Sequence, residues 1–154
     1  MEIFFADAKD TRQIIDMRLE YLREDGVDRG KESQIAEQLG RFIPENIGKR
    51  LFCVLAREGE KPCAAAMLLI NEKPAGASFS NGMTAEILSV ITMPEYRRQG
   101  IASAMLRMLI DKAKELDVSF IDLKATADGY PLYRKLGFES TGGHYESMRL
   151  KLDR

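Results

Sequence analysis

One segment constrains the fold of this chain more than any other, because a strand pattern runs through a glycine-containing turn directly into a long helix pattern. The strand pattern is the β-branched run at 87–92, Ile-Leu-Ser-Val-Ile-Thr. The helix pattern begins at Ile101 and carries apolar residues at helical spacing as far as Leu116. A second strand pattern follows at 119–125. Strand, helix and strand in this order predict a parallel, right-handed crossover.

The turn between strand and helix also predicts an anion-binding site. The first N–H groups of a helix have no partner inside it, and the helix macrodipole adds about half a positive charge there. Gly100 has no side chain to keep a phosphate away from the backbone, and Ala102 has only a methyl group. Arg97 and Arg98 add positive charge at the same place. The alternative, that both arginines are solvated and Gly100 only shapes the turn, stays open at this point.

Other phosphate-binding motifs are excluded by their glycine patterns. A P-loop requires Gly-x-x-x-x-Gly-Lys-Ser/Thr and a dinucleotide fold requires Gly-x-Gly-x-x-Gly. Neither pattern occurs in the chain.

Length and charge limit the classes of protein to consider. A chain of 154 residues suits a single domain, 1–154, with one sizeable core. Its formal net charge of −1 gives no electrostatic reason to expect nucleic acid or an anionic membrane surface as the main partner. We find neither a signal-peptide pattern nor an apolar run of membrane-spanning length, so we expect a cytoplasmic protein.

The chain has few residues that could hold a metal. Cys53 and Cys63 are its two cysteines, and both lie in apolar strand-like runs, which predicts buried free thiols. His144 is the single histidine and follows Gly142-Gly143 in a predicted turn. We therefore expect no metal site.

The remaining elements are predicted from periodicity and turn residues. Upstream of the central segment we expect a strand at 2–6, a helix capped by Asp10 or Thr11, a helix at 31–43 ended by Pro44, strands at 51–57 and 62–70, a turn-rich segment at 71–83 and a strand at 85–92. Downstream we expect a short helix capped by Asp128 and stopped by Gly137, with Phe138 folding back onto it, and a final strand at 145–152.

Two blocks of sequence in this order resemble the GNAT superfamily of acyl-CoA-dependent N-acyltransferases. The first block is 90–102, Val-Ile-Thr-Met-Pro-Glu-Tyr-Arg-Arg-Gln-Gly-Ile-Ala, and the second is 131–138, Pro-Leu-Tyr-Arg-Lys-Leu-Gly-Phe. The element order matches over nearly the whole chain, and specific residues match between about 84 and 138. The resemblance implies a single α+β domain with a mixed, twisted sheet of six to seven strands flanked by about four helices.

The resemblance also implies a coenzyme site. Main-chain groups of the strand at Val90 and Thr92 would pair with pantetheine, and N–H groups of the turn would bind the pyrophosphate of coenzyme A. The implied cofactor-binding residues are Val90, Ile91, Thr92, Arg97, Arg98, Gln99, Gly100, Ile101, Ala102, Ser103 and Thr126. Many members have asparagine where this chain has Thr126 and glycine where it has Arg98, and neither difference removes a backbone donor.

Two residues are implied as catalytic. Tyr133 matches the family tyrosine whose hydroxyl protonates the leaving thiolate, and its alternative role is packing of the short helix. Glu86 stands where some members have a base that deprotonates the attacking ammonium. Strand periodicity puts Glu86 and Val90 on one face, but a straight strand separates Glu86 from Thr92 by about 20 Å, so direct proton abstraction needs a bulge or a water relay. The alternative for Glu86 is a structural or substrate-binding carboxylate.

The expected function is transfer of an acetyl group from acetyl-CoA, as cosubstrate, to a primary amine of a small molecule or peptide, by direct attack in a ternary complex. A homodimer is left open. The alternatives are a non-catalytic acyl-CoA-binding regulatory module and a protein-interaction module. The resemblance places the acceptor near 23–33, 71–83 and 139–147. The acidic residues of the first loop, Glu24, Asp25, Asp28 and Glu32, favour a cationic amine.

Overall fold

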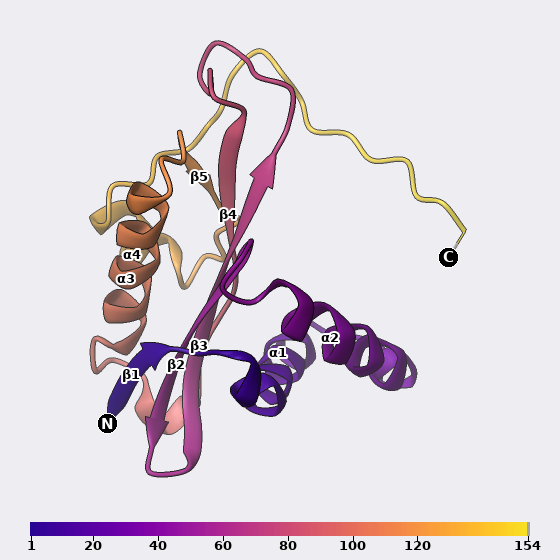
Figure 1. Cartoon of the computed structure of the whole chain (residues 1–154), viewed down its shortest axis with the longest axis vertical. Coiled ribbons are helices and arrows are strands. Elements are labelled where there is room, and N and C mark those ends of the chain that lie inside the picture. The colour runs from indigo at the N-terminus through magenta and orange to yellow at the C-terminus, as the bar shows by residue number, and fades with distance from the viewer. Residues whose placement is uncertain (154) are drawn as a thin grey trace. The chain divides into compact units, whose positions relative to one another are not determined.

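A mixed sheet of five strands organises the first of the two units into which the chain divides, Met1–Lys124 (Figure 1). The computed structural model describes residues 1–153. The strands lie in the order of the sequence: β1 (Glu2–Phe5), β2 (Leu51–Glu58), β3 (Lys61–Glu72), β4 (Met83–Thr92) and β5 (Ile121–Asp122). Neighbouring strands are antiparallel except β4 and β5, which are parallel as the crossover pattern predicts.

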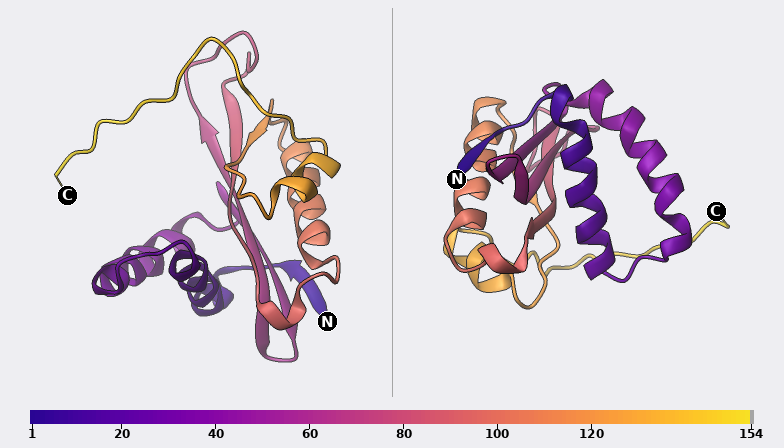
Figure 2. Two further views of the ribbon diagram at one scale, coloured as in Figure 1. Left: turned by 180° about the vertical axis from the view of Figure 1, so that it is seen from behind. Right: turned by 90° about the horizontal axis from the view of Figure 1, so that it is seen from below.

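Helices cover both faces of this sheet. Figure 2 shows α1 (Thr11–Glu24) and α2 (Glu32–Asn46) on one face and α3 (Ile101–Glu115) on the other. On the α1/α2 face, Ile14 of α1 and Ile43 of α2 are fully buried in a cluster with Leu55 of β2 and Met67 of β3. The apolar stripe of α3 is buried as well, at Ile101, Met105, Leu106, Leu109 and Ala113. The helical periodicity of the sequence thus identifies the faces that form the core.

The sheet is smaller than expected. It has five strands rather than six to seven, while the expected four α-helices are present within residues 1–153, the last being α4 (Tyr130–Lys135). The strand expected at 119–125 is reduced to Ile121–Asp122, and the segment expected as a strand at 145–152 has no strand assignment. None of the helices in the described residues is long and apolar enough to cross a membrane.

Three helix boundaries differ from expectation. Helix α2 continues through Pro44 to Asn46, because only the N–H that would bond Gly40 is lost, and the turn still closes through a 2.9 Å bond from Ile47 N–H to the Ile43 carbonyl. Helix α1 has no side-chain cap, and Asp7 caps the preceding 3₁₀ turn Ala8–Asp10 instead. Helix α4 is preceded by Gly129 rather than by an Asp128 cap.

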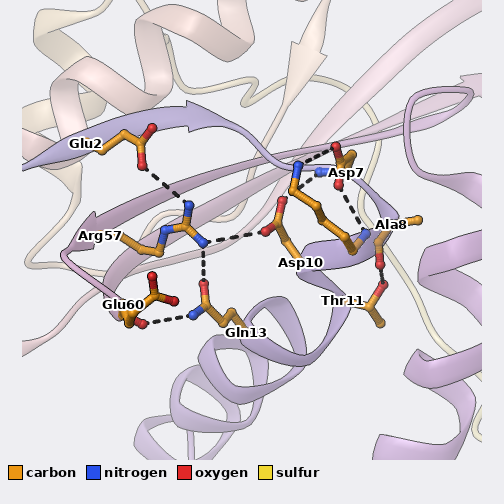
Figure 3. Close-up of polar contacts among 9 residues, drawn as sticks. Glu2, Asp7, Ala8, Asp10, Thr11, Gln13, Arg57 and Glu60 are labelled. Carbon is orange, nitrogen blue, oxygen red and sulfur yellow. Dashed lines mark hydrogen bonds and ion pairs between the residues drawn. The ribbon is translucent and has the colours of Figure 1, made fainter.

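A cluster around Arg57 ties β1, β2 and the start of α1 together (Figure 3). The guanidinium lies 3.6 Å from the buried carboxylate of Asp10 and 3.4 Å from that of Glu2, and it stacks over the Phe4 ring at 4.4 Å. It also donates to the Gln13 side-chain oxygen at 3.3 Å. Because Asp10 is only 5% exposed, this pairing compensates a carboxylate that has lost most of its water.

Candidate active site

Strand β4 contains a bulge at Ser89. On β3, Ala65 pairs with Ile91 and Met67 pairs with Leu88, so Ser89 and Val90 together oppose the single residue Ala66. Ser89 has a φ of 56°, in the left-handed region, and its side chain is buried. A non-glycine residue held in this conformation inside a strand is a backbone strain of the kind found at functional sites.

The bulge changes which side chains of β4 share a face. Leu88 and Ile91, three residues apart, both pack in the cluster beneath α1 and α2. Glu86 lies directly opposite Leu69, which packs against the same cluster, so Glu86 belongs to the α1/α2 face of the sheet. The expectation that Glu86 and Val90 share a face is therefore wrong, because the extra residue at Ser89 inverts the alternation after it.

Beyond the bulge, one edge of β4 has no neighbouring strand in the described residues. The parallel pairing with β5 covers Ala85 and Glu86, where Ala85 N–H donates to the Phe120 carbonyl at 3.1 Å. At the far end, Met93 N–H donates to the Cys63 carbonyl of β3 at 2.8 Å. Because main-chain groups alternate between the two edges of a strand, those of Val90 and Thr92 point away from β3. They form a strand edge without a strand neighbour among residues 1–153, along which the Thr92 carbonyl accepts from Arg97 Nε at 2.9 Å.

The turn after β4 carries a second set of main-chain donors. We call residues 97–103 the cradle. Gly100, with φ 78° and ψ 8°, caps α3 without a side-chain hydrogen bond, and Arg98 before it is also left-handed, with φ 62°. The first N–H of α3 that has a partner is that of Ala104, which donates to the Gly100 carbonyl at 3.1 Å.

The preceding N–H groups of the helix, at 101–103, have no acceptor among residues 1–153. A Cβ built on Gly100 meets no atom within 4 Å, so the space on that side of the turn is open. The cradle thus has the free donors, dipole and open approach that a phosphate group needs.

The side chain of Arg97 is already engaged. Its Nε donates to the Thr92 carbonyl at 2.9 Å, and its Nη2 donates to Glu24 at the end of α1 at 2.8 Å. Arg97 therefore fixes the cradle to the ends of β4 and α1. Arg98 is exposed, forms no ion pair with the described residues and remains the cation available to an incoming anion.

A pocket of about 600 Å³ borders Gly100 and Ile101 on the side of β1. Its lining includes the carboxylates of Glu58 and Glu95. Glu58 is paired with the amino terminus at 3.6 Å and Glu95 with Lys61 at 3.5 Å, so the cations nearest to these two carboxylates are already engaged.

The acidic loop that the resemblance associates with the acceptor is partly neutralised by ion pairs. Glu32 accepts from Arg23 at 2.6 Å, Glu24 accepts from Arg97, and Asp28 accepts from the Gly30 N–H at 2.9 Å. These bonds order the loop between α1 and α2. They also reduce the field that the loop offers to a cation.

The second unit, which begins at Ala125, holds the two remaining candidate residues. Tyr133 lies in α4, and the helix ends as predicted: Phe138 N–H bonds the Tyr133 carbonyl at 3.0 Å, Gly137 has φ 102°, and the rings of Phe138 and Tyr133 pack edge to face at 6.0 Å. Thr126 accepts from the Gly129 N–H at 3.1 Å through its hydroxyl.

Gly129 leaves room for the Tyr133 ring. A Cβ at Gly129 would stand 2.8 Å from the Tyr133 ring, so any side chain there displaces the tyrosine. The turn 126–129 and the Schellman end at Gly137 therefore fix the position of Tyr133 within its own unit.

The two thiols are free and buried, as expected. Burial raises the pKa of Cys53 to about 12, and burial also raises the pKa of Cys63. Neither is a thiolate at neutral pH, and neither lies on β4 or in the cradle. Among residues 1–153, no group of three or more His, Cys, Asp and Glu side chains is arranged to hold a metal ion.

Two features of this site were not foreseen from the sequence. Nothing in the residue type of Ser89 indicates a left-handed conformation, although the spacing of three between Leu88 and Ile91 is a weak signal of a bulge. Glu24 was assigned to the acceptor loop, whereas its carboxylate holds Arg97. Such a pairing, across 73 positions, has no local sequence signature.

Comparison with known proteins matches most of the chain to one family. Residues 12–138 match the model of the acetyltransferase (GNAT) family. Two of the similar solved structures have a TM-score of 0.81: a predicted acetyltransferase with acetyl-CoA from Clostridium acetobutylicum, 26% identical over 96% of this chain and 95% of that one, and a GCN5-related N-acetyltransferase from Ralstonia eutropha JMP134, 23% identical over 96% and 97%. At 23% identity, the similarity to the Ralstonia eutropha structure shows a shared fold and nothing more.

Curated relatives match over a shorter stretch. A protein named "Uncharacterized N-acetyltransferase ycf52" from Porphyra purpurea is 34% identical over 64 residues, which is 42% of this chain and 37% of that protein. The matched stretch thus spans little more than a third of the length of that relative.

Proposed function

The chain belongs to the acetyltransferase (GNAT) family, and on that premise we propose that it transfers the acetyl group of acetyl-CoA to a primary amine by direct attack in a ternary complex. One observation carries the proposal: a bulged strand with an open edge leads directly into a helix whose first N–H groups are free. This arrangement offers consecutive sites for an extended amide-containing arm and for a pyrophosphate.

The coenzyme would bind mainly through the backbone. Pantetheine amides pair with the open edge of β4 at Val90 and Thr92, and the pyrophosphate binds N–H groups of the cradle, with Arg98 adding charge. Ile101 is buried and anchors the start of α3, so the donors are held in place before the ligand arrives. Thr126 is the further candidate contact for pantetheine.

In the proposed reaction, the amine nitrogen attacks the thioester carbonyl and the C–S bond breaks. The main-chain N–H groups beside the bulge stabilise the oxyanion as it forms, and the Tyr133 hydroxyl gives its proton to the leaving thiolate. The proton that the nitrogen loses as the amide forms restores the Tyr133 hydroxyl. The attacking ammonium first loses a proton, for which Glu86 is the candidate acceptor. Because the bulge puts the side chain of Glu86 on the α1/α2 face and that of Val90 on the other, this proton transfer would run through a water relay.

A covalent acetyl-enzyme is disfavoured because the chain offers no activated nucleophile in β4 or the cradle. Cys53 has a pKa of about 12 and lies in β2 under the helices. Direct attack needs only approximation of the two substrates, which can supply about 7–11 kcal/mol of the barrier reduction.

For the acceptor we propose a class of amines rather than one compound. A cationic amine remains our proposal for the acceptor, but the internal pairing of Glu24, Asp28 and Glu32 weakens the electrostatic argument from that loop. The carboxylates that still support it are Asp25, which is exposed and forms no ion pair with the described residues, and Glu86, on the face covered by α1 and α2.

The test is release of free thiol from acetyl-CoA across a panel of amines, after thermal stabilisation by acetyl-CoA has been measured on the same protein. We expect stabilisation, and turnover with polyamines or lysine-like amines ahead of neutral acceptors. Stabilisation without turnover on any amine would favour a non-catalytic acyl-CoA-binding module. If millimolar acetyl-CoA gave no thermal stabilisation, that result would contradict the proposed coenzyme site.

A further inference from the structure

The ion pair between Glu24 and Arg97 joins two segments of the first unit that lie 73 positions apart in the sequence. Glu24 is the last residue of α1, and Arg97 is the first residue of the cradle. The Nη2 of Arg97 donates to the Glu24 carboxylate at 2.8 Å, while the Nε of the same guanidinium donates to the Thr92 carbonyl at 2.9 Å. One side chain therefore connects the end of α1 to the end of β4.

The Arg97 end of this connection is held by the backbone around it. Arg97 N–H donates to the Pro94 carbonyl at 3.3 Å, and Arg98, which follows, is left-handed. A planar guanidinium donates in fixed directions. Arg97 can therefore reach Thr92 and Glu24 at the same time only while the backbone on both sides of it keeps its place.

The Glu24 end is also fixed. After α1 the chain turns at Gly26, which has φ 88° and whose N–H donates to the Arg23 carbonyl at 3.1 Å. The Arg23 side chain in turn donates to a carboxylate of α2 at 2.6 Å. The end of α1 and the loop after it, residues 25–31, are thus tied to α2 as well as to Arg97.

Stability alone does not account for a glutamate at this position. A carboxylate in the last turn of a helix lies near the negative end of the helix dipole, where a cation is favoured instead. Both side chains of the Glu24–Arg97 pair are half-exposed, and ion pairs of that kind contribute little to stability. The pair is therefore better explained by the two segments that it connects than by what it adds to folding.

We propose that Glu24 is a positioning residue for the acetyl transfer: through Arg97 it holds the loop at 25–31 in a fixed place relative to the coenzyme site. The inference rests on the proposed function, in which pantetheine pairs with β4 at Thr92 and the pyrophosphate binds the cradle. Bound coenzyme immobilises the backbone on both sides of Arg97. Holding Glu24 then costs Arg97 less conformational entropy, so coenzyme binding tightens the loop without touching it.

The loop carries a carboxylate that this positioning serves. Asp25 directly follows Glu24, is exposed and forms no ion pair with the described residues. It can attract the cationic amine that we propose as the acceptor. A loop held in place keeps this charge, and the amine that it attracts, at a constant distance from the thioester, and approximation of this kind lowers the barrier to attack.

The experiment measures amide hydrogen exchange of the full chain with and without saturating coenzyme A, in the absence of any amine. In the unaltered protein, coenzyme A should slow exchange at 101–103, where its pyrophosphate binds. It should also slow exchange at 25–27 by about 2- to 5-fold, the scale of one exposed ion pair. Glu24→Ala should keep the slowing at 101–103 and abolish the slowing at 25–27.

The matched control is Glu20→Ala. Glu20 also lies in α1 and also accepts from an arginine, Arg23, at 3.0 Å, but that arginine does not contact β4 or the cradle. This variant should keep the slowing in both segments. Each substitution removes one exposed ion pair, so the midpoint of thermal unfolding should fall by no more than about 4 °C in either variant.

The outcomes separate this inference from the proposed function. Slowing at 101–103 without slowing at 25–27 in the unaltered protein would overturn the inference and leave the coenzyme site in place. Slowing at 25–27 that persists in Glu24→Ala, or that is also lost in Glu20→Ala, would overturn it too. If coenzyme A left exchange at 101–103 unchanged, the proposed coenzyme site itself would fail, and the role of Glu24 with it.

Discussion

Replacing Gly100 by alanine separates the role of the cradle in binding from its role in folding. The matched control is Gly48→Ala, in the turn before β2. Gly48 has φ 80° against 78° for Gly100, and a Cβ built at either position meets no atom within 4 Å. The two substitutions therefore impose the same backbone strain, without steric overlap in the free protein.

Both variants should lose stability by the same amount. A residue with a Cβ in the left-handed region costs about 1–2 kcal/mol. For a domain of this size, that loss lowers the midpoint of thermal unfolding by about 2–8 °C. Calorimetric or fluorescence melting curves of the two variants should coincide within about 2 °C.

Acetyl-CoA affinity should fall only in Gly100→Ala. The added methyl stands where pyrophosphate oxygens must approach the free N–H groups at 101–103, and losing one charge-assisted hydrogen bond costs about 1.5–3 kcal/mol. Isothermal titration should therefore give a dissociation constant about 10- to 150-fold higher than wild type for Gly100→Ala, and an unchanged one for Gly48→Ala. Equal affinities in the two variants would refute the cradle as the phosphate site.

Three further predictions follow from single side chains. Tyr133→Phe should lower kcat by about 10- to 1000-fold with little change in acetyl-CoA affinity, as loss of a general acid does, and a kcat within twofold of wild type would make the tyrosine structural. Asp10→Ala should lower the free energy of unfolding, measured in urea, by about 2–4 kcal/mol because it leaves Arg57 without its buried partner. Replacing the exposed partner, Glu2→Ala, should lower it by about 0.5 kcal/mol or less. Equal losses in the two variants would contradict the burial argument. The Cys53 thiol should react with a disulfide reagent only after unfolding. Its pKa is about 12 in the folded chain and 9.0 is the ordinary value, so the unfolded chain releases this proton first as the pH rises. The free energy of unfolding should therefore fall as pH rises from about 9 towards 12.

Most of the fold could be predicted because it rests on local patterns. Helical spacing of apolar residues gave α1 and α3, and the turn at Gly59 gave the β2–β3 hairpin. The prediction of a strand at 145–152 was wrong, because alternating apolar residues specify which face of a strand is buried but not which strand it pairs with. The prediction that Pro44 ends the second helix was wrong as well, because the burial of Ile43 outweighs the loss of one backbone hydrogen bond.

The site was predictable where the backbone does the binding and not where distant segments meet. The left-handed turn at Gly100 and the free N–H groups at the start of α3 followed from glycine and a helix start, which are adjacent in sequence; the anion site built on them stays a prediction. The bulge at Ser89 requires a left-handed serine that sequence alone does not favour, and it reversed the expected face of Glu86. The Glu24–Arg97 pair joins two elements that only the folded sheet brings together.

The most direct test of the account is the position of coenzyme A in a crystal of the full chain soaked or grown with it. We predict pyrophosphate oxygens within hydrogen-bond distance of the main-chain N–H groups at 100–103, and pantetheine amides paired with the β4 edge at Val90 and Thr92. Coenzyme A bound instead in the pocket beside Glu58 and Glu95, or bound without contact to β4, would contradict the central claim that this open edge and the cradle together form the acetyl-CoA site.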